Sequence, residues 1–457
     1  MTAISAPATA ARATGPILTL TCAAPLLVLI NYTAPMVSVA GTADALGAGP
    51  TGPAWMINGI ALGLAALLLV AGSLADDHGR RRVYVIGTWL LALSSVAVAT
   101  SVNTPMFVAA RLVQGAASAA MLAAGLGIIG HAFPGGPQRL HATGRYGAML
   151  GLGIAAGPLL SGGLAAVWDW RAVYWVIALA AVALAVAASR ALPESRAEHP
   201  RPPDVAGAVT LGLGVAALLI AITEGRSGWT RPPVLAALAA AGALIAAFVA
   251  VEHRRARSGG APMIDLSLFR RPPFLVATGG ALVAGVAVIG LMSYLPTVLR
   301  LAHGIAPLTS AALFCAWSGV AFLTALAAKR LRISARARLA LGLLLSGAGT
   351  LPLLGVAADA TWPLVVGGLV VGGLGSGLIN ASLTHLAIES VPPQQAGMGS
   401  GANNTARYIG ASIGVAAVAS VVGGQGLYAG TDIAVLAAAA LCALAAAATL
   451  LPAARRP

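Results

Sequence analysis

Charged and aromatic side chains are scarce in this sequence. Asp, Glu, Lys and Arg make up only 9% of its 457 residues and aromatic residues only 5%, whereas 58% of the residues are hydrophobic. A soluble domain carries roughly 25% charged residues, so this chain lacks the polar surface that water requires. Its 56 glycines suit close helix packing inside a bilayer. We therefore predict an all-α membrane protein.

Cysteine is also rare, and its placement excludes several kinds of site. Cys22, Cys315 and Cys442 lie in apolar segments, and none belongs to a CxxC or CxxH pattern, which argues against a metal site or a disulfide framework. The sequence has no phosphate-binding loop of the GxxxxGK[ST] type, so ATP hydrolysis within this chain is not expected. No Ser/His/Asp grouping appears either, and we predict neither an enzyme nor a cofactor.

The formal net charge of +14 raises the question of nucleic-acid binding. The basic residues, however, form short clusters between apolar runs and do not line up beside aromatic side chains. Such clusters are typical of the loops that orient a membrane protein. No nucleic-acid partner is therefore predicted.

Apolar runs long enough to cross a bilayer recur along the whole chain. A spanning helix needs about 20 mostly apolar residues. Fourteen runs meet this length, and the first is interpreted as a retained helix, not a signal peptide. The predicted spans are 17–39, 54–74, 83–101, 105–129, 146–166, 172–189, 205–223, 233–251, 274–297, 308–328, 337–357, 363–386, 396–422 and 432–452.

Two longer connections, 190–204 and 252–272, bracket the seventh and eighth spans. They divide the chain into an N-terminal six-helix bundle (1–190), a linker with two additional spans (191–272) and a C-terminal six-helix bundle (273–457). We expect this 6+2+6 arrangement to behave as one monomer in the membrane.

The basic residues predict the orientation. With the N-terminus inside, 21 of the 27 basic residues fall in cytoplasmic segments, two fall within helices, and only Arg171, Arg226, Arg231 and Arg300 fall in outer loops. Basic residues concentrate on the cytoplasmic side of membrane proteins. Both termini are therefore predicted to be cytoplasmic, in a multi-pass protein of the inner (plasma) membrane of a cell.

A glycine- and arginine-rich loop follows the second span. It reads Gly72-Ser-Leu-Ala-Asp76-Asp77-His78-Gly79-Arg80-Arg81-Arg82. Gly72 permits close helix contact, Gly79 permits a tight turn, and Asp76 can interact with a helix N-terminus or with Arg80. The loop resembles the signature G-x-L-a-D-r-x-G-r-r of the major facilitator superfamily, where it latches the two halves on the cytoplasmic side. Asp77 departs from that pattern, since the family usually has a basic residue there.

Two helical motifs extend the resemblance. Arg111-Leu-Val-Gln114-Gly115 resembles the R-x-x-Q-G motif of the superfamily; an arginine within a span faces the bundle interior or snorkels to the interface. The fifth span resembles the antiporter motif G-x-x-x-G-P-x-x-G-G through Gly153, Gly157, Pro158 and Gly162, with Ser161 replacing a glycine. Glycines four residues apart form a flat packing face, and Pro158 bends the helix.

Further stretches resemble the fourteen-helix drug:proton antiporter branch of the superfamily. They begin at Asp204, Glu252, Pro262 and Val391, so the resemblance covers nearly the whole chain. It implies a major-facilitator fold of two six-helix bundles that rock about a central cavity. It also implies export of drugs, antibiotics or metabolites by alternating access, coupled to protons. The alternatives are an uptake carrier of the same superfamily and a non-transporting membrane sensor or scaffold.

The expected proton site is missing. The branch usually has an Asp in its first helix, in an L-D-x-T pattern, but Asn31 occupies that position here. None of the 13 acids falls in the middle of a predicted span, so Asp76, Glu224 and Glu389 are the candidate titrating residues. The alternatives are a histidine (His131, His303 or His385) or a transporter without the usual proton coupling.

Polar residues on the predicted helices mark a candidate pathway. Arginines without a buried acid favour a neutral or anionic substrate over a polycation. The same residues can also serve as hydrogen bonds between packed helices. The candidates are Asn31, Tyr32, Asn58, Arg111, Gln114, Tyr294, Asn380, Asn403 and Arg407.

Overall fold

The apolar runs form long helices, and the described residues contain no strand. A computed structural model describes residues 8–49, 51–133, 136–196, 204–225, 228–258, 266–391 and 396–450. Up to residue 258 the helices are α1 (Ala8–Thr33), α2 (Pro35–Ala45), α3 (Gly52–His78), α4 (Arg80–Ala99), α5 (Thr104–Ala132), α6 (Gly136–Val167), α7 (Ala172–Ala191), α8 (Val205–Glu224) and α9 (Pro232–Arg257).

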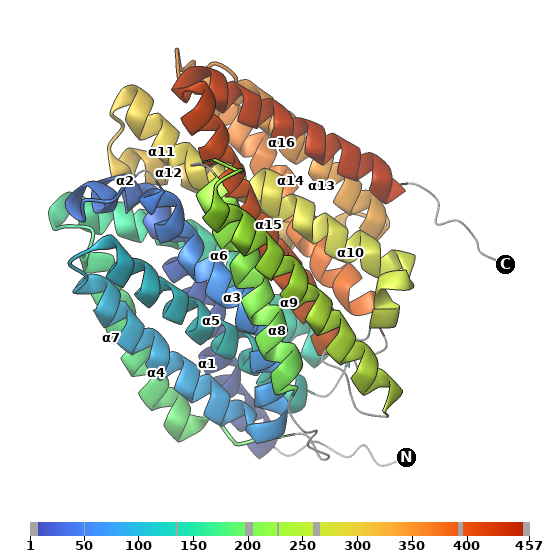
Figure 1. The fold of residues 1–457 in the computed structure, drawn as a ribbon. Helices are drawn as coiled ribbons and strands as arrows, with labels where there is room; N and C mark the ends of the chain where they lie inside the picture. Colours follow the sequence, from blue (N-terminus) through green and yellow to red (C-terminus); the bar gives the residue numbers. More distant parts are fainter. Residues whose placement is uncertain are drawn as a thin grey trace.

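The second half continues the pattern with more interruptions. Its elements are η2 (Leu266–Arg270), α10 (Pro272–Val283), the π-helical η3 (Ala284–Ile289), α11 (Gly290–His303), α12 (Pro307–Ala327), η4 (Ala328–Arg330), α13 (Ala335–Thr350), η5 (Leu351–Leu353), α14 (Trp362–Glu389), α15 (Ala396–Gln425) and α16 (Leu427–Leu450). Figure 1 shows α1–α7 on one side and α10–α16 on the other.

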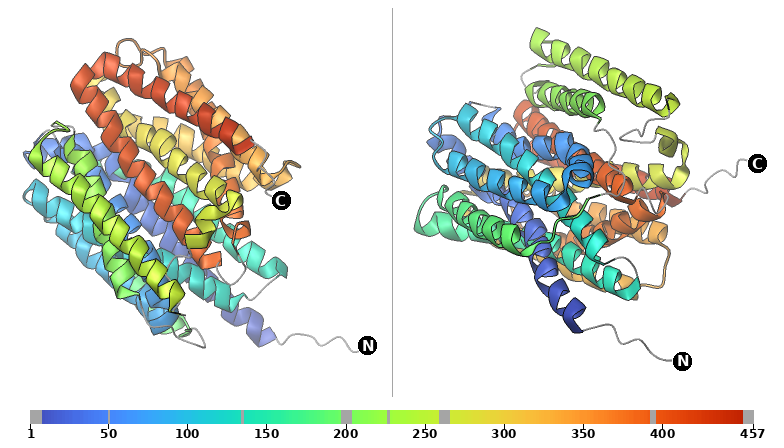
Figure 2. Two further views of the ribbon diagram at one scale, coloured as in Figure 1. Left: turned by 45° about the vertical axis from the view of Figure 1, so that its right-hand side comes forward. Right: turned by 90° about the horizontal axis from the view of Figure 1, so that it is seen from below.

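The helices α8 and α9 lie on the outside of this pair of bundles. They pack against each other, α8 also contacts α3 and α15, and α9 reaches η2. Figure 2 shows the two helices side by side at the edge of the molecule. Because α8 contacts one helix from each bundle, it bridges them at the periphery.

Twelve helices in the described residues are long and apolar enough to cross a membrane. The remaining two predicted spans fall on α3 and α13. The apolar part of α3 that qualifies by composition is Gly52–Leu68, and α13 has only 16 residues. The chain is therefore a multi-pass membrane protein with at least these twelve apolar helices.

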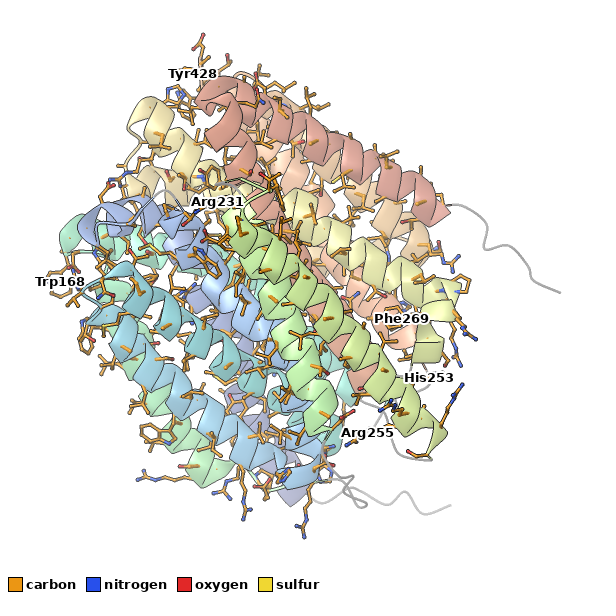
Figure 3. The ribbon with its side chains drawn as sticks, in the orientation of Figure 1. Trp168, Arg231, His253, Arg255, Phe269 and Tyr428 are labelled. Atoms are coloured by element: carbon orange, nitrogen blue, oxygen red, sulfur yellow. The ribbon has the colours of Figure 1, made fainter. Side chains whose placement is uncertain are left out.

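The two ends of the helices carry different residues. In Figure 3, Trp168, Arg231 and Tyr428 lie at one end of the helices, and His253 and Phe269 lie at the other. We call these the Trp168 end and the His253 end. The basic run Arg254, Arg255 and Arg257, which closes α9, lies at the His253 end.

Local sequence explains where the helices begin and break. Asn103 caps α5, because its side chain accepts a hydrogen bond from the backbone N–H of Met106 at 2.9 Å. Ser334 caps α13 in the same way. Pro35 has no N–H to donate to the carbonyl of Asn31, and the first predicted span accordingly divides into α1 and α2 at this point.

Small residues let the helices approach closely. A Cβ on Gly63 of α3 would lie 2.3 Å from the carbonyl oxygen of Leu112, and one on Gly115 of α5 would lie 2.4 Å from that of Ile60. Real side chains do not tolerate such distances, so only glycine fits at this crossing. Lipid provides no hydrophobic force between helices, and close packing of this kind holds them together.

Candidate functional site

The arginine of α5 is fully buried. Arg111 is 0% exposed, as are Asn31 of α1 and Gln114. The Nη1 group of Arg111 donates to the carbonyl oxygen and to the Oδ1 of Asn31 at 2.9 and 3.0 Å, and to the Oε1 of Gln114 at 2.9 Å. The Nε2 of Gln114 donates in turn to Ser95 on α4 at 2.9 Å. We call these four residues the Arg111 cluster.

Pro35 makes this cluster possible. The carbonyl of Asn31 would normally accept from the N–H four residues later, but Pro35 has none. The free carbonyl is instead occupied by Arg111. The guanidinium thus does not snorkel to the interface; it joins α1 and α5 at the break between α1 and α2, and its Nε also donates to the carbonyl of Met56 on α3 at 3.4 Å.

A second arginine–amide cluster lies on α15. Arg407 donates to the Oδ1 of Asn380 on α14 at 3.1 Å and to the Oδ1 of Asn404 at 2.8 Å. Its guanidinium carbon lies 5.5 Å from the ring centre of Tyr408. Asn404, which was not among the predicted pathway residues, completes this group three residues before Arg407, one helical turn away.

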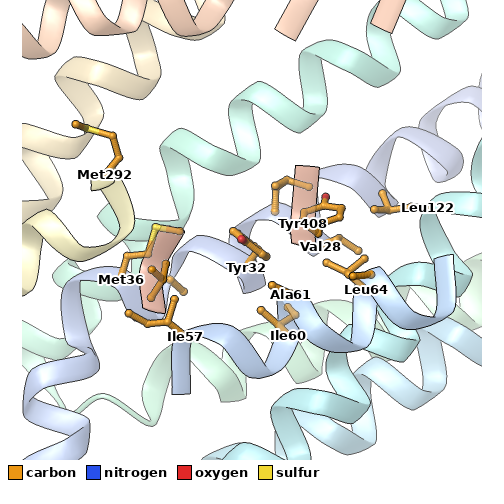
Figure 4. Close-up of a cluster of buried hydrophobic side chains, with 14 of the residues drawn as sticks. Val28, Tyr32, Met36, Ile57, Ile60, Ala61, Leu64, Leu122, Met292 and Tyr408 are labelled. Carbon is orange, nitrogen blue, oxygen red and sulfur yellow. The ribbon is translucent and has the colours of Figure 1, made fainter. Parts of the chain in front are cut away.

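A pair of tyrosines lies on the contact between the two bundles. The rings of Tyr32 on α1 and Tyr408 on α15 lie 5.7 Å apart, centre to centre. Figure 4 shows both among buried side chains that include Met36 and Met292. Asn58 on α3 also crosses between the bundles, since its Nδ2 donates to the carbonyl of Ser412 at 3.4 Å.

The remaining predicted pathway residues have more local surroundings. The Nδ2 of Asn403 donates to the carbonyl of Ala277 on α10 at 2.9 Å, which ties α15 to its own bundle. Tyr294 on α11 is buried. Near it, the six-residue π-helical turn η3 interrupts what the sequence predicts as one continuous span, and a Cβ on its Gly285 would lie 2.3 Å from the carbonyl of Arg407.

The glycine- and arginine-rich loop lies between α3 and α4. Gly79 has φ +110°, a conformation that favours glycine. A Cβ there would lie 2.8 Å from the carboxyl carbon of Glu194, whose Oε1 also accepts from the backbone N–H of Arg81 at 3.0 Å. Arg80 lies over Gly127 of α5. Gly72 makes only an ordinary contact, with Ala123, and the side chain of Asp76 lies outside the described residues.

The glycines of α6 face two different partners. A Cβ on Gly153 would lie 2.6 Å from the carbonyl of Leu26, and one on Gly157 would lie 2.8 Å from that of Ile30, both on α1. Gly162, beyond Pro158, faces α12 of the other bundle, where a Cβ would lie 3.0 Å from the carbonyl of Pro307. One helix therefore packs on α1 within its bundle and on α12 across the interface.

The acids occupy different environments. Glu224 at the end of α8 is half-buried and accepts from the indole N–H of Trp55 on α3 at 2.9 Å. The side chain of Glu389 is 66% exposed beside His385, with 3.2 Å between Nδ1 and Oε2. Asp44 on α2 lies 3.9 Å from Arg300 on α11 in an exposed ion pair between the bundles.

Two buried acids were not among the predicted site residues. Glu252 is 0% exposed and Asp204 is 7% exposed. A Cβ on Gly207 would lie 2.6 Å from the Oδ2 of Asp204 and 2.7 Å from the Oε1 of Glu252, which places these oxygens at most about 5.3 Å apart. Arg255 lies 3.3 Å from the other oxygen of Asp204. The sequence placed Glu252 after a span ending at 251, but α9 continues to Arg257, and burial follows from its packing on α8.

A hollow with a mainly apolar lining lies away from these clusters. It has a volume of about 490 Å³, lies between α12, η4 and α14 and is lined by Val320, Leu323, Thr324, Ala327, Ala328, Arg330, Leu331, Leu374 and Leu378. The described residues contain no group of three or more His, Cys, Asp or Glu side chains placed to hold a metal ion.

Comparison with known proteins shows which family this chain resembles. The model of the Major Facilitator Superfamily matches residues 21–415. The chain is 33% identical over 380 residues to a probable actinorhodin transporter of Streptomyces coelicolor, covering 80% of this chain and 65% of that protein. It is 31% identical over 378 residues to the multidrug resistance protein Stp of Mycobacterium tuberculosis, covering 82% of this chain and 69% of that protein.

A solved structure shows the same fold. The crystal structure of the human organic anion transporter MFSD10 superposes with a TM-score of 0.65 at 18% identity, covering 95% of this chain and 99% of that one. In sequence, the match spans slightly less than two thirds of the length of the actinorhodin transporter.

Proposed function

The chain belongs to the major facilitator superfamily, and from that premise we propose that it exports small organic molecules, neutral or anionic, by alternating access. The observation that carries export is the relatedness to proteins named as an actinorhodin transporter and a multidrug resistance protein, at 31–33% identity over about four fifths of the chain.

The proposed topology has fourteen spans. In addition to the twelve apolar helices, α3, which has 27 residues, and α13 each form one span. Residues 1–190 and 273–457 then form the two six-helix bundles, with two additional spans in 191–272. The arginines that close α9 support a cytoplasmic His253 end, because basic residues concentrate on that side. On this view, both termini are cytoplasmic in a monomer of the plasma membrane.

The cytoplasmic gate in this proposal is the loop at Gly79. Glu194 contacts this loop from the segment after α7, and Arg80, the first residue of α4, lies against α5, so a movement of the loop relative to these two segments rearranges both contacts. The contact of Gly162 with α12 gives the bundles a close-packed surface on which to rock.

The charge of the interior supports the class of cargo. Arg111 and Arg407 are bonded to amide and carbonyl oxygens, and the acids Asp204 and Glu252 lie at the peripheral contact between α8 and α9. A lipophilic polycation that enters between the bundles would approach these two arginines, whose hydrogen-bond partners among the described residues include no acid. A neutral or anionic molecule would not be repelled by these arginines.

Proton coupling in this proposal rests on Glu224. Its half-buried carboxylate links the bridging helix α8 to α3 through Trp55, so protonation changes a contact between moving parts. Glu389, in contrast, is 66% exposed and pairs with His385 on its own helix. Asp76 stays a candidate of the gating loop.

The test uses transport in both directions. Inside-out vesicles are prepared from cells that express the protein. A proton gradient is imposed, and neutral, anionic and cationic fluorescent compounds are added. An exporter concentrates a neutral or anionic compound inside, and a protonophore abolishes the gradient. Glu224→Gln should lose the gradient dependence, whereas Glu389→Gln, the matched control, should keep it. Depletion of the compound from the vesicles would instead establish an uptake carrier, and no movement of any compound would favour a sensor or scaffold.

A further inference from the structure

The guanidinium of Arg111 carries its charge in a fully buried position among neutral partners. Its bonded acceptors are the two oxygens of Asn31, the amide oxygen of Gln114 and the carbonyl of Met56. None of these acceptors is a carboxylate. A guanidinium stays protonated in proteins, so the positive charge has no counter-ion among these contacts.

Two donors on residues that are bonded to each other have no acceptor among the described residues. The Nη2 of Arg111 and the Nδ2 of Asn31 are buried, and neither has a hydrogen-bond partner among the described residues. The bond from Nη1 to the Oδ1 of Asn31 settles which amide atom is the oxygen, so the orphaned atom is the NH₂ group. Because Nη1 already holds that amide, both orphaned groups belong to one small region where α1 meets α5.

The two orphaned groups carry four N–H bonds on residues that are joined through the bond from Nη1 to Oδ1, together with one positive charge that has no counter-ion among these contacts. A water molecule can accept hydrogen bonds there but cannot neutralise the charge. An anion does both. We propose that the Nη2 of Arg111 and the Nδ2 of Asn31 form a buried anion-binding site that takes a halide or the carboxylate of a small organic acid.

Asn31 determines the specificity of this site. An aspartate at residue 31 would supply a permanent carboxylate to Nη1 and leave no charge for a free anion to balance. The asparagine keeps the same shape and the bond to Nη1, adds two donors, and leaves the charge to the ligand. Arg407 differs, because it is only half-buried and two amide oxygens occupy its terminal nitrogens.

The test measures thermal unfolding of the purified full chain in lipid nanodiscs. Sodium gluconate is replaced by sodium chloride, or by sodium benzoate, at constant ionic strength and pH. The unfolding temperature of the unmodified protein should rise with chloride and saturate. Asn31→Asp should abolish the rise. Asn103→Asp, the matched control, adds the same charge at an exposed helix cap that aspartate also serves, and should keep the full rise.

The outcomes separate the two sources of the anion. A response to benzoate and chloride together indicates a site open to an organic carboxylate, and a response to chloride alone indicates a site for a small inorganic ion. No response in the unmodified protein, or an equal response in Asn31→Asp and Asn103→Asp, would overturn the proposal in favour of a bound water.

Two further measurements cover a failure of Asn31→Asp to fold. Gln114→Glu offers a carboxylate to the same Nη1 and should remove the chloride response as well. Direct binding of radioactive chloride to the unmodified protein should show one saturable site per chain, and its absence contradicts the proposal without any variant. Both readouts use the purified protein and hold whether or not it exports.

Discussion

Replacement of Gly153 by alanine should loosen the packing between α6 and α1. A Cβ on Gly153 would lie 2.6 Å from the carbonyl oxygen of Leu26 and 2.8 Å from the Cβ of Leu29. Ordinary contact begins at 3.4 Å, so the two helices must separate locally by roughly 0.8 Å or distort. Overpacking of this kind costs about 1–3 kcal/mol, which corresponds to about a 5- to 150-fold fall in the folded-to-unfolded ratio.

The damage should extend to the Arg111 cluster. Asn31 follows Leu29 by two residues on α1, and its bond to Arg111 is 3.0 Å long. A shift of α1 therefore weakens the contact with α5 as well. Gly157→Ala should behave similarly, because a Cβ there meets the backbone carbonyl of Ile30 at 2.8 Å and the hydroxyl of Thr33 at 2.1 Å.

Gly163→Ala is the matched control for this experiment. It lies on the same helix, and a Cβ there would have nothing within 4 Å. Both variants gain the same intrinsic helix propensity, so their difference isolates the packing cost. Thermal melting and detergent-induced unfolding of purified protein should place Gly153→Ala below Gly163→Ala. If Gly153→Ala melts at or above the control, the close contact of α6 with α1 is not what holds these helices together.

Three further predictions concern other parts of the molecule. Gly79→Ala should abolish export with normal amounts of protein in the membrane, because the alanine would have to adopt φ +110° and its Cβ would meet the carboxylate of Glu194. Normal transport by this variant would show that the loop is not part of the gate. Arg300→Gln should change stability by less than about 1 kcal/mol, since its ion pair is exposed; a larger loss in a melting curve would contradict this. Gly207→Ala should lower the melting temperature by crowding the buried acids between α8 and α9, whereas Gly242→Ala, which meets nothing within 4 Å, should not. Equal melting of these two variants would show that the acids can move aside.

Much of the candidate site was predictable as residue types, but not as contacts. The sequence singled out Asn31, Arg111 and Gln114 separately, and the structure joins them through one nitrogen. The sequence left two interpretations of Arg111 open, burial or snorkelling, because the distance of a residue from a helix end does not reveal which face of the helix its neighbours cover. Complete burial settles that choice in favour of the interior.

The sequence by itself determined that this protein lies in a lipid bilayer and which segments can cross that bilayer. Hydropathy is a local property, so each apolar run could be recognised without its neighbours, and most predicted spans coincide with observed helices. Proline and glycine positions carried similar local information. Gly79 lies at the positive φ that its motif implied, although no pattern indicated its contact with Glu194.

Only the tertiary structure decided which polar groups meet. Asp204 and Glu252 are 48 residues apart in sequence, and both fall in predicted connections, but the packing of α8 on α9 buries them beside Gly207. The pairing of Tyr32 with Tyr408 likewise needs two bundles to come together. The reason is physical: hydropathy and backbone conformation are set within a few residues, whereas the partner of a buried charge is set by whichever helix arrives beside it.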